Sequence, residues 1–160
     1  MKSSRGKQAT GLVHDLVKAP PGSPNSFLGF PLALDLDNLD ADIAILGVPF
    51  GLPYVVGELA NDQSRAPDAI RQNAQDAAWE EPRTRVHFDW DLGGPLLDNR
   101  PVKVVDCGNV TADMFDPYEH YRRAQVAAEK IFQSGATLIT LGGDHGIPIP
   151  VMRPCQKIRR

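Results

Sequence analysis

Hydrophobic positions after residue 40 alternate between short continuous runs and longer amphipathic stretches. Three apolar, β-branched runs are bounded by glycine or proline, as in strands buried on both faces: 41–48, 102–106 and 136–141. After each of the first two runs, a loop leads into a stretch with the hydrophobic spacing of a helix. Val86–Phe88 could add at most a short strand. Strands alternating with helices in this way predict a parallel α/β sheet.

The two helices differ in how clearly their ends are marked. Asp116 can cap the second helix, Pro117 fits its first position and Glu119 stands three residues after the cap. Gly135 can take the left-handed conformation that closes it. The apolar stripe of this helix is Tyr121, Ala124, Ala128, Ile131 and Phe132. The first helix should open at Ser64 and Pro67 and end near Glu81, with an apolar face at Ala66, Ile70, Ala74, Ala77 and Ala78.

The chain ends differ from this central pattern. Residues 1–36 show no sustained period, and prolines and glycine interrupt 19–25, which predicts an extended arm over a surface or into a neighbouring subunit. Residues 37–153 form the expected α/β domain. Residues 154–160 are a short basic tail, and Pro154 would break a helix continuing into it.

Composition narrows the class of protein. Seventeen basic and twenty acidic residues give a net charge of −3, so nucleic acid is not an expected partner. No apolar stretch approaches the roughly 20 residues that span a bilayer, so no membrane partner is expected. The two cysteines form no C-x-x-C pair, which fits a reducing cytoplasm. The basic, acid-poor residues 1–18 resemble an organelle transit peptide only weakly.

Chemistry in a parallel sheet gathers at the carboxyl ends of its strands, which here are 47–51, 106–109 and 142–146. Gly142 and Gly143 let the backbone turn sharply and leave Asp144 and His145 projecting from a strand end. A neutral imidazole is the commonest ligand for a divalent metal, and a carboxylate can ligate too or orient the ring. Taken alone, these residues fit a metal site and an Asp-His turn that closes a strand equally well.

Four segments nevertheless resemble one family in order and rough spacing. Leu141–His145 (LGGDH) resembles the first metal motif of the ureohydrolases, which include arginases, agmatinases and guanidinobutyrases. Residues 45–50 resemble the family's first strand, 65–71 its "GPxAIR" helix start and 104–110 its "vDxGDv" strand end. The resemblance covers residues 41–153. It leans towards the agmatinase-like branch, with the long proline-rich arm as weaker support.

The resemblance implies a three-layer α/β/α parallel sheet of the arginase/deacetylase type. It also implies a binuclear metal centre, manganese or in some members nickel, whose hydroxide attacks a small guanidino substrate and releases urea. His145 is the metal ligand that carries over to this sequence, with Asp144, Gly142 and Gly143 as supporting residues. Family members assemble as homo-oligomers, so an oligomer is expected for the complete form.

Departures from the family pattern limit what the chain can do alone. Gly51 and Asn109 stand where many members have aspartate, and Gly146 replaces the commoner serine. The family's second and third metal motifs, Asp-x-His-x-Asp and Asp-x-Asp, are missing after His145. The fold is therefore expected to be incomplete, as a frameshift, a retained intron or a shortened gene model would make it. The alternatives are a non-catalytic fragment that partners a full-length relative, and an α/β binding module without metal.

Other titratable residues have ordinary interpretations. His87 is expected in a packed aromatic cluster with Phe88 and Trp90, and His14 and His120 at exposed positions. Asp106 is expected to accept hydrogen bonds from loop amides. The standard nucleotide-binding and serine-hydrolase motifs are absent from the sequence.

Overall fold

A computed structural model describes residues 16–22, 26–51, 62–74, 88–95, 100–113 and 116–155. His14, His87, the second half of the helix expected over 64–81 and most of the basic tail lie outside the described residues. Among the helices of the described ranges, none has the length and apolar composition needed to cross a bilayer.

A four-stranded sheet forms the centre of the described structure, in the order β1-β5-β2-β6. Strand β2 (Ile43–Val48) pairs in parallel with β5 (Val104–Val110) on one side and with β6 (Thr137–Gly142) on the other. Strand β1 (Val17–Lys18) adds an antiparallel edge to β5. The parallel pairing predicted for the three apolar runs is therefore confirmed.

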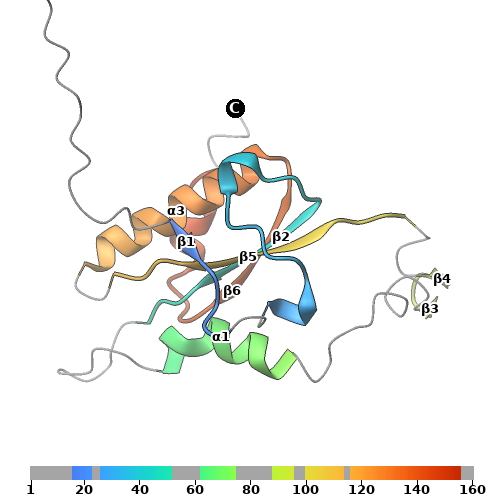
Figure 1. The fold of residues 1–160 in the computed structure, drawn as a ribbon, viewed down its shortest axis with the longest axis horizontal. Helices are drawn as coiled ribbons and strands as arrows, with labels where there is room; N and C mark the ends of the chain where they lie inside the picture. The colour runs from blue at the N-terminus through green and yellow to red at the C-terminus, as the bar shows by residue number, and fades with distance from the viewer. Residues whose placement is uncertain are drawn as a thin grey trace, which may run out of the picture.

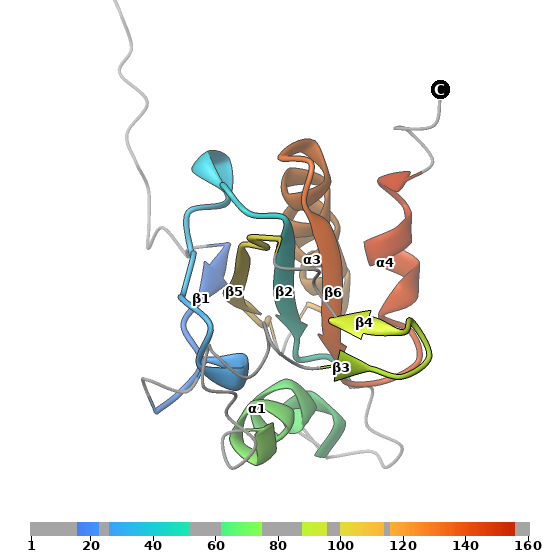
Figure 2. The ribbon, with the colours of Figure 1, turned by 90° about the vertical axis from the view of Figure 1, so that its right-hand side faces the viewer.

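Helices lie on both faces of this sheet. Figure 1 shows α1 (Asp62–Ala74) and α3 (Pro117–Gln133) on opposite sides of the strands, and Figure 2 shows the short α4 (Pro148–Met152) beside α3. Two short 3₁₀ turns, η1 (Phe27–Gly29) and η2 (Leu36–Asn38), precede β2. A small hairpin of β3 (Phe88–Asp89) and β4 (Gly94–Pro95) completes the described elements.

The predicted ends of α3 are confirmed. The Asp116 side chain accepts a hydrogen bond from the Glu119 amide at 3.0 Å, Pro117 occupies the first turn, and Gly135 has φ of 88°. Pro117 and Gly135 thus fix where the helix starts and stops. The helix buries His120, Ala124, Ala127, Ala128 and Ile131 against the sheet, while Tyr121 and Phe132 are partly buried at its margin.

Strand β5 corrects the expectation of a strand over 102–106. It begins at Val104 and continues through Gly108 and Asn109 to Val110. Its register against β2 shifts by one residue, because Ile45 lies opposite Asp106 while Gly47 lies opposite Asn109. Gly108 has φ of 70°, which only glycine adopts easily, so the irregularity is a β-bulge that lets the strand continue.

Helix α1 corrects a second expectation. It begins at Asp62, two residues before the predicted start, and Ile70 on the predicted apolar face is 39% exposed. The large side chain that α1 buries completely is Arg71. A charged partner inside the sheet explains this orientation.

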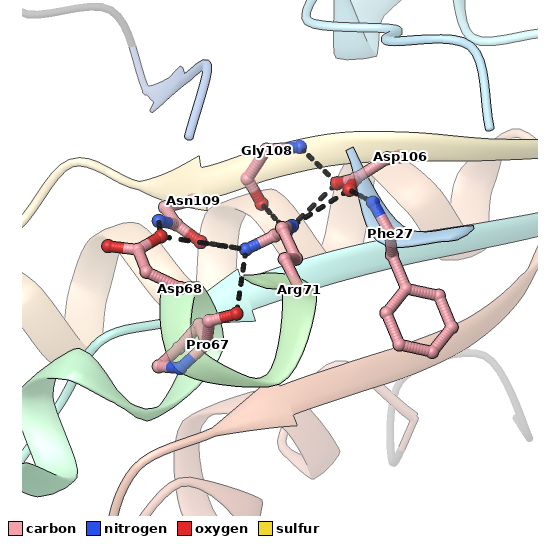
Figure 3. A network of polar contacts seen from close by, with 7 residues as sticks. All are labelled: Phe27, Pro67, Asp68, Arg71, Asp106, Gly108 and Asn109. Atoms are coloured by element: carbon pink, nitrogen blue, oxygen red, sulfur yellow. Dashed lines mark hydrogen bonds and ion pairs between the residues drawn. The ribbon is translucent and has the colours of Figure 1, made fainter. Parts of the chain in front are cut away.

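Arg71 and Asp106 form a fully buried ion pair (Figure 3). The Arg71 Nε and Nη2 atoms each donate to one Asp106 carboxylate oxygen at 2.8 Å. Asp106 also accepts from the Phe27 amide at 2.7 Å and from the Gly108 amide at 2.8 Å. Asp106 thus accepts from backbone amides as predicted, although these lie in η1 and in β5 itself rather than in a loop. Its principal partner is a guanidinium 35 residues away in the sequence.

The remaining donors of Arg71 reach a second set of acceptors. Nη2 donates to the Gly108 carbonyl at 3.0 Å, and Nη1 donates to Asn109 Oδ1 at 2.6 Å (Figure 3). Asn109 Nδ2 in turn donates to Asp68 Oδ1 at 2.6 Å. Position 109 therefore uses both halves of an amide, an acceptor towards Arg71 and a donor towards Asp68.

The described part of the predicted arm lies against β5. Val17 pairs with Val110 in β1, the Ala33 amide donates to the Asp106 carbonyl at 2.9 Å, and the Asp106 amide donates to the Pro31 carbonyl at 2.9 Å. The backbone of Asp106 therefore holds the arm on the side of β5 opposite β2, while its side chain holds α1.

Strand β6 is the other edge of the sheet as far as the structure is described. Ile139 is 45% exposed, and the strand contains no charged residue or proline. Charges, prolines and bulges are the devices that keep edge strands from pairing with other chains. Within the described residues, β6 therefore carries none of the features that keep an edge strand from pairing with another strand.

Substitution of Asp106 by alanine should strongly destabilise the protein, because it leaves a buried guanidinium without its counter-charge. The expected loss is about 3–5 kcal/mol in the free energy of unfolding, measured by urea denaturation. Asp40→Ala is the control, because Asp40 pairs with Lys103 on the surface, and it should cost about 1 kcal/mol or less. Equal losses in the two variants would contradict the role given to the buried pair.

Substitution of Ile139 by lysine should weaken self-association through the β6 edge, because a charge is costly in an apolar strand pairing. Sedimentation velocity over a concentration series would measure it. Ile149→Lys is the matched control, since Ile149 is 55% exposed and lies on α4 rather than in a strand of the sheet. A parent chain that is monomeric at all concentrations would show that the edge does not pair.

Candidate functional site

The three predicted strand ends lie next to one another. Gly47 and Val48 pair with Leu141 and Gly142, which places the ends of β2 and β6 side by side. A Cβ atom added to Gly47 would lie 1.9 Å from Asn109 Oδ1, so the side chain of Asn109 fills the space beside the end of β2. The residues that could carry chemistry are thus brought to one edge of the sheet, as the parallel topology requires.

Gly143 lies where two backbones meet closely. A Cβ atom on it would lie 1.8 Å from the Phe50 carbonyl oxygen and 2.6 Å from that of Gln63. Any side chain here would clash with backbone that cannot move aside. Gly143 therefore lets the loop 142–146 pack against the end of β2 and the start of α1. The atoms that come so close to Gly143 belong to the backbone of the same chain.

Asp144 organises the turn that carries His145. Its amide donates to the Phe50 carbonyl at 2.9 Å, and its Oδ1 accepts from the Gly146 amide at 2.7 Å. The residues on both sides of His145 are thus hydrogen-bonded. Asp144 is half-buried while His145 is exposed, so the imidazole projects from a fixed turn at the end of β6.

The donor set for a metal is only partly present. The imidazole of His145 suits one ligand position, and the carboxylate of Asp144 lies next to it in the chain. Within the described ranges, no group of three or more His, Cys, Asp or Glu side chains is arranged to hold a metal ion. Loop 142–146 therefore fits one ligand position and does not form a complete metal site.

Cys107 does not add to this donor set. It is fully buried, and burial together with the nearby charge of Asp106 raises the pKa of its thiol to about 12, although Arg71 acts in the opposite direction. A thiol that stays protonated at neutral pH is a poor metal ligand and a poor nucleophile. Cys107 is a residue of the core.

His120 corrects the expectation of an exposed histidine. It is buried and stacks on Phe50, with ring centroids 5.4 Å apart and an interplanar angle of 9°. The signal was in the sequence, because position 120 continues the helical spacing of the buried residues 124, 127 and 131.

Burial lowers the pKa of His120. The positive charge of Arg123 acts in the same direction, while the backbone of Thr111 and the charge of Asp113 act against it. His120 is therefore held as a neutral ring under the end of β2, where its stacking partner Phe50 also binds the Asp144 amide.

Phe88 and Trp90 form an edge-to-face pair on the hairpin, with centroids 4.9 Å apart. Trp90 is 87% exposed, so this pair is a surface feature in the described residues. The place predicted for His87 in this cluster stays a prediction, because His87 itself lies outside the described residues.

Known proteins agree with this architecture. The family model described as "Arginase family" matches residues 41–160, which is most of the chain. The chain belongs to the arginase family. This confirms the ureohydrolase resemblance inferred from the four motifs.

The relatives of this arginase-family chain include agmatinases. It is 35% identical over 127 residues to an agmatinase of Proteus mirabilis and 37% identical over 127 residues to one of Photorhabdus laumondii. Each alignment covers 79% of this chain and 38% of the relative. The chain thus spans well under half the length of the curated relatives it matches.

Solved structures show the same fold. A hypothetical agmatinase from Burkholderia thailandensis superposes with a TM-score of 0.61 at 26% identity, over 83% of this chain and 38% of that one. Proclavaminate amidino hydrolase from Streptomyces clavuligerus gives a TM-score of 0.61 at 20% identity, over 90% and 41% of the two chains. The described sheet and helices of this arginase-family chain are accordingly an incomplete version of the arginase-type α/β fold.

The buried neutral His120 should make stability depend on pH. Its pKa is lower in the folded than in the unfolded chain, where it is near 6.5, so the unfolded state takes up the extra proton. The free energy of unfolding should be at its full value above about pH 6.5 and should fall as the pH drops below it. His120→Phe, which keeps a ring against Phe50, should flatten this slope in denaturation curves between about pH 5 and 7.

His145→Gln is the control for this measurement, since it removes an exposed histidine. It should leave the slope as it is in the parent chain. A slope that persists unchanged in His120→Phe would show that other groups cause the pH dependence.

Proposed function

We propose that this arginase-family chain belongs to a protein that hydrolyses a small guanidino compound to urea and an amine, as an agmatinase-like enzyme. The observation that carries the proposal is His145, an exposed imidazole on a turn whose flanking residues are both hydrogen-bonded, at the strand end where the family motif stands. The similarity to agmatinases supports the substrate class.

In this proposal His145 is a ligand of one ion of a binuclear centre, manganese or alternatively nickel. Two divalent ions would supply an activated water for attack on the guanidinium carbon. Asp144 keeps the turn closed through the Gly146 amide, and Gly143 lets the loop pack on Phe50. The other described residues carry no reaction step in this proposal, because they do not complete the donor set.

A second candidate is a non-catalytic role of the 160-residue chain by itself, in assembly with a longer relative or with copies of itself in the cytoplasm. The incomplete donor set and the unprotected edge of β6, both within the described residues, favour it. Urea release from agmatine, 4-guanidinobutanoate or guanidine by the chain alone, loaded with manganese or nickel, would exclude the second candidate. No release would fit both candidates, because the described residues do not complete the donor set.

A chimera tests the proposed chemistry directly. Residues 41–153 would replace the matching segment of the Proteus mirabilis agmatinase, which supplies the remainder of the fold. The manganese-loaded chimera should release urea from agmatine. His145→Ala in the chimera should lower kcat/KM at least about 100-fold, because even outer partners of metal ligands are worth about 10- to 100-fold.

Ile149→Ala is the control in the same segment, because this side chain is exposed and beyond the loop. It should leave kcat/KM within about twofold, as for a surface substitution. A folded chimera that binds manganese but releases no urea would sink the agmatinase-like assignment. Activity unchanged by His145→Ala would sink the ligand role.

A further inference from the structure

Gly146, the residue directly after His145, faces the hydroxyl of Tyr121. A Cβ atom on Gly146 would lie 2.5 Å from Tyr121 Oη and 3.0 Å from Asp144 Oδ1. Gly146 is absent from the glycines with positive φ among the described residues. What glycine provides at this position is therefore space for the tyrosine hydroxyl, and the backbone conformation would accept other residues.

The ring of Phe50 holds Tyr121 in place. The two rings pack with centroids 4.6 Å apart and an interplanar angle of 52°. Phe50 is buried, and its carbonyl accepts from the Asp144 amide. Phe50 and Tyr121 thus contact the turn at Asp144 and at Gly146, the two neighbours of His145.

The hydroxyl of Tyr121 is neutral at physiological pH. Burial and the negative charge of Asp144 raise its pKa, against a smaller opposite effect of Arg153. A neutral hydroxyl can pack closely against the Cα atom of Gly146 without bringing a second charge beside Asp144.

We propose that Tyr121 is a positioning residue for His145, and that it acts by packing its hydroxyl against Gly146 so that the turn 144–146 has one conformation. Tyr121 and Gly146 are then a size-matched pair. The proposal rests on the proposed function only for what His145 binds, because the packing itself needs no ligand.

If Tyr121 and Gly146 are matched in size, substitutions at the two positions should compensate each other, which a general loss of stability would not do. A serine at position 146 should clash with the hydroxyl of Tyr121, and removal of that hydroxyl should make room for it. Tyr121→Phe should therefore rescue Gly146→Ser, although each substitution alone loosens the turn.

The experiment is a double-mutant cycle on the chain, read by amide hydrogen exchange at Asp144 and Gly146, whose amides are both hydrogen-bonded. Tyr121→Phe should speed exchange at Gly146 about 3- to 10-fold, the range for loss of one hydroxyl contact. Gly146→Ser should speed it at least as much, and the double variant should exchange no faster than Tyr121→Phe alone. Gly146→Ala repeats the test with the smallest side chain.

Tyr118→Phe is the matched control, because Tyr118 lies on the same helix and is 86% exposed. It should leave exchange at both amides unchanged. Equal effects of Tyr118→Phe and Tyr121→Phe, or a Gly146→Ser variant that Tyr121→Phe does not rescue, would overturn the proposal.

Manganese affinity separates this proposal from the function on which it draws. By calorimetry on the chimera, in which the remainder of the fold is supplied, His145→Ala should abolish the binding of one manganese ion, and Tyr121→Phe should weaken it. If His145→Ala leaves binding unchanged while the exchange cycle behaves as expected, the ligand role fails and the positioning role stands. If His145→Ala abolishes binding but the cycle shows no coupling, only the positioning role fails.

Discussion

The ion pair of Arg71 and Asp106 is the interaction on which the described fold depends. Burying two charges is costly unless their hydrogen-bonding capacity is used, and here Arg71 donates five hydrogen bonds. Through Asp106 the pair joins three parts of the chain that are distant in sequence, namely α1, β5 and the segment before β2. The position of α1 against the sheet, and with it the contact of Gln63 on Gly143, follows from this pair.

Local sequence signals were sufficient for much of the fold. Capping at Asp116 and the glycine at 135 fixed α3, and apolar runs gave the three parallel strands. The Arg71–Asp106 pair could not be predicted, because a charged residue is assumed to be exposed until its partner is known, and the partner lies 35 positions away. The burial of His120 differs from the prediction for a related reason, since a polar residue is expected at the surface even where the helical spacing places it inside.

The candidate site, too, could be predicted from the sequence only in part. The glycine-rich turn and the exposure of an imidazole beside a carboxylate follow from the order of residues 142–146 at a strand end. The residues that support the turn do not, because Phe50 and Tyr121 have the same apolar spacing as ordinary core residues and only the folded arrangement brings them to Asp144 and Gly146. Sequence patterns thus located the chemistry but not the packing that orients it.

The bulge in β5 decides which side chains a single guanidinium can reach. In a regular strand, side chains alternate between the two faces, so residues three apart point in opposite directions. Asp106 and Asn109 are three apart, yet both bind Arg71. The extra residue at the bulge reverses the alternation and turns Asn109 to the face of Asp106. If the same residues formed a regular strand without the bulge, Asn109 would face α3, and Asp68 and Arg71 would lose the amide that lies between them.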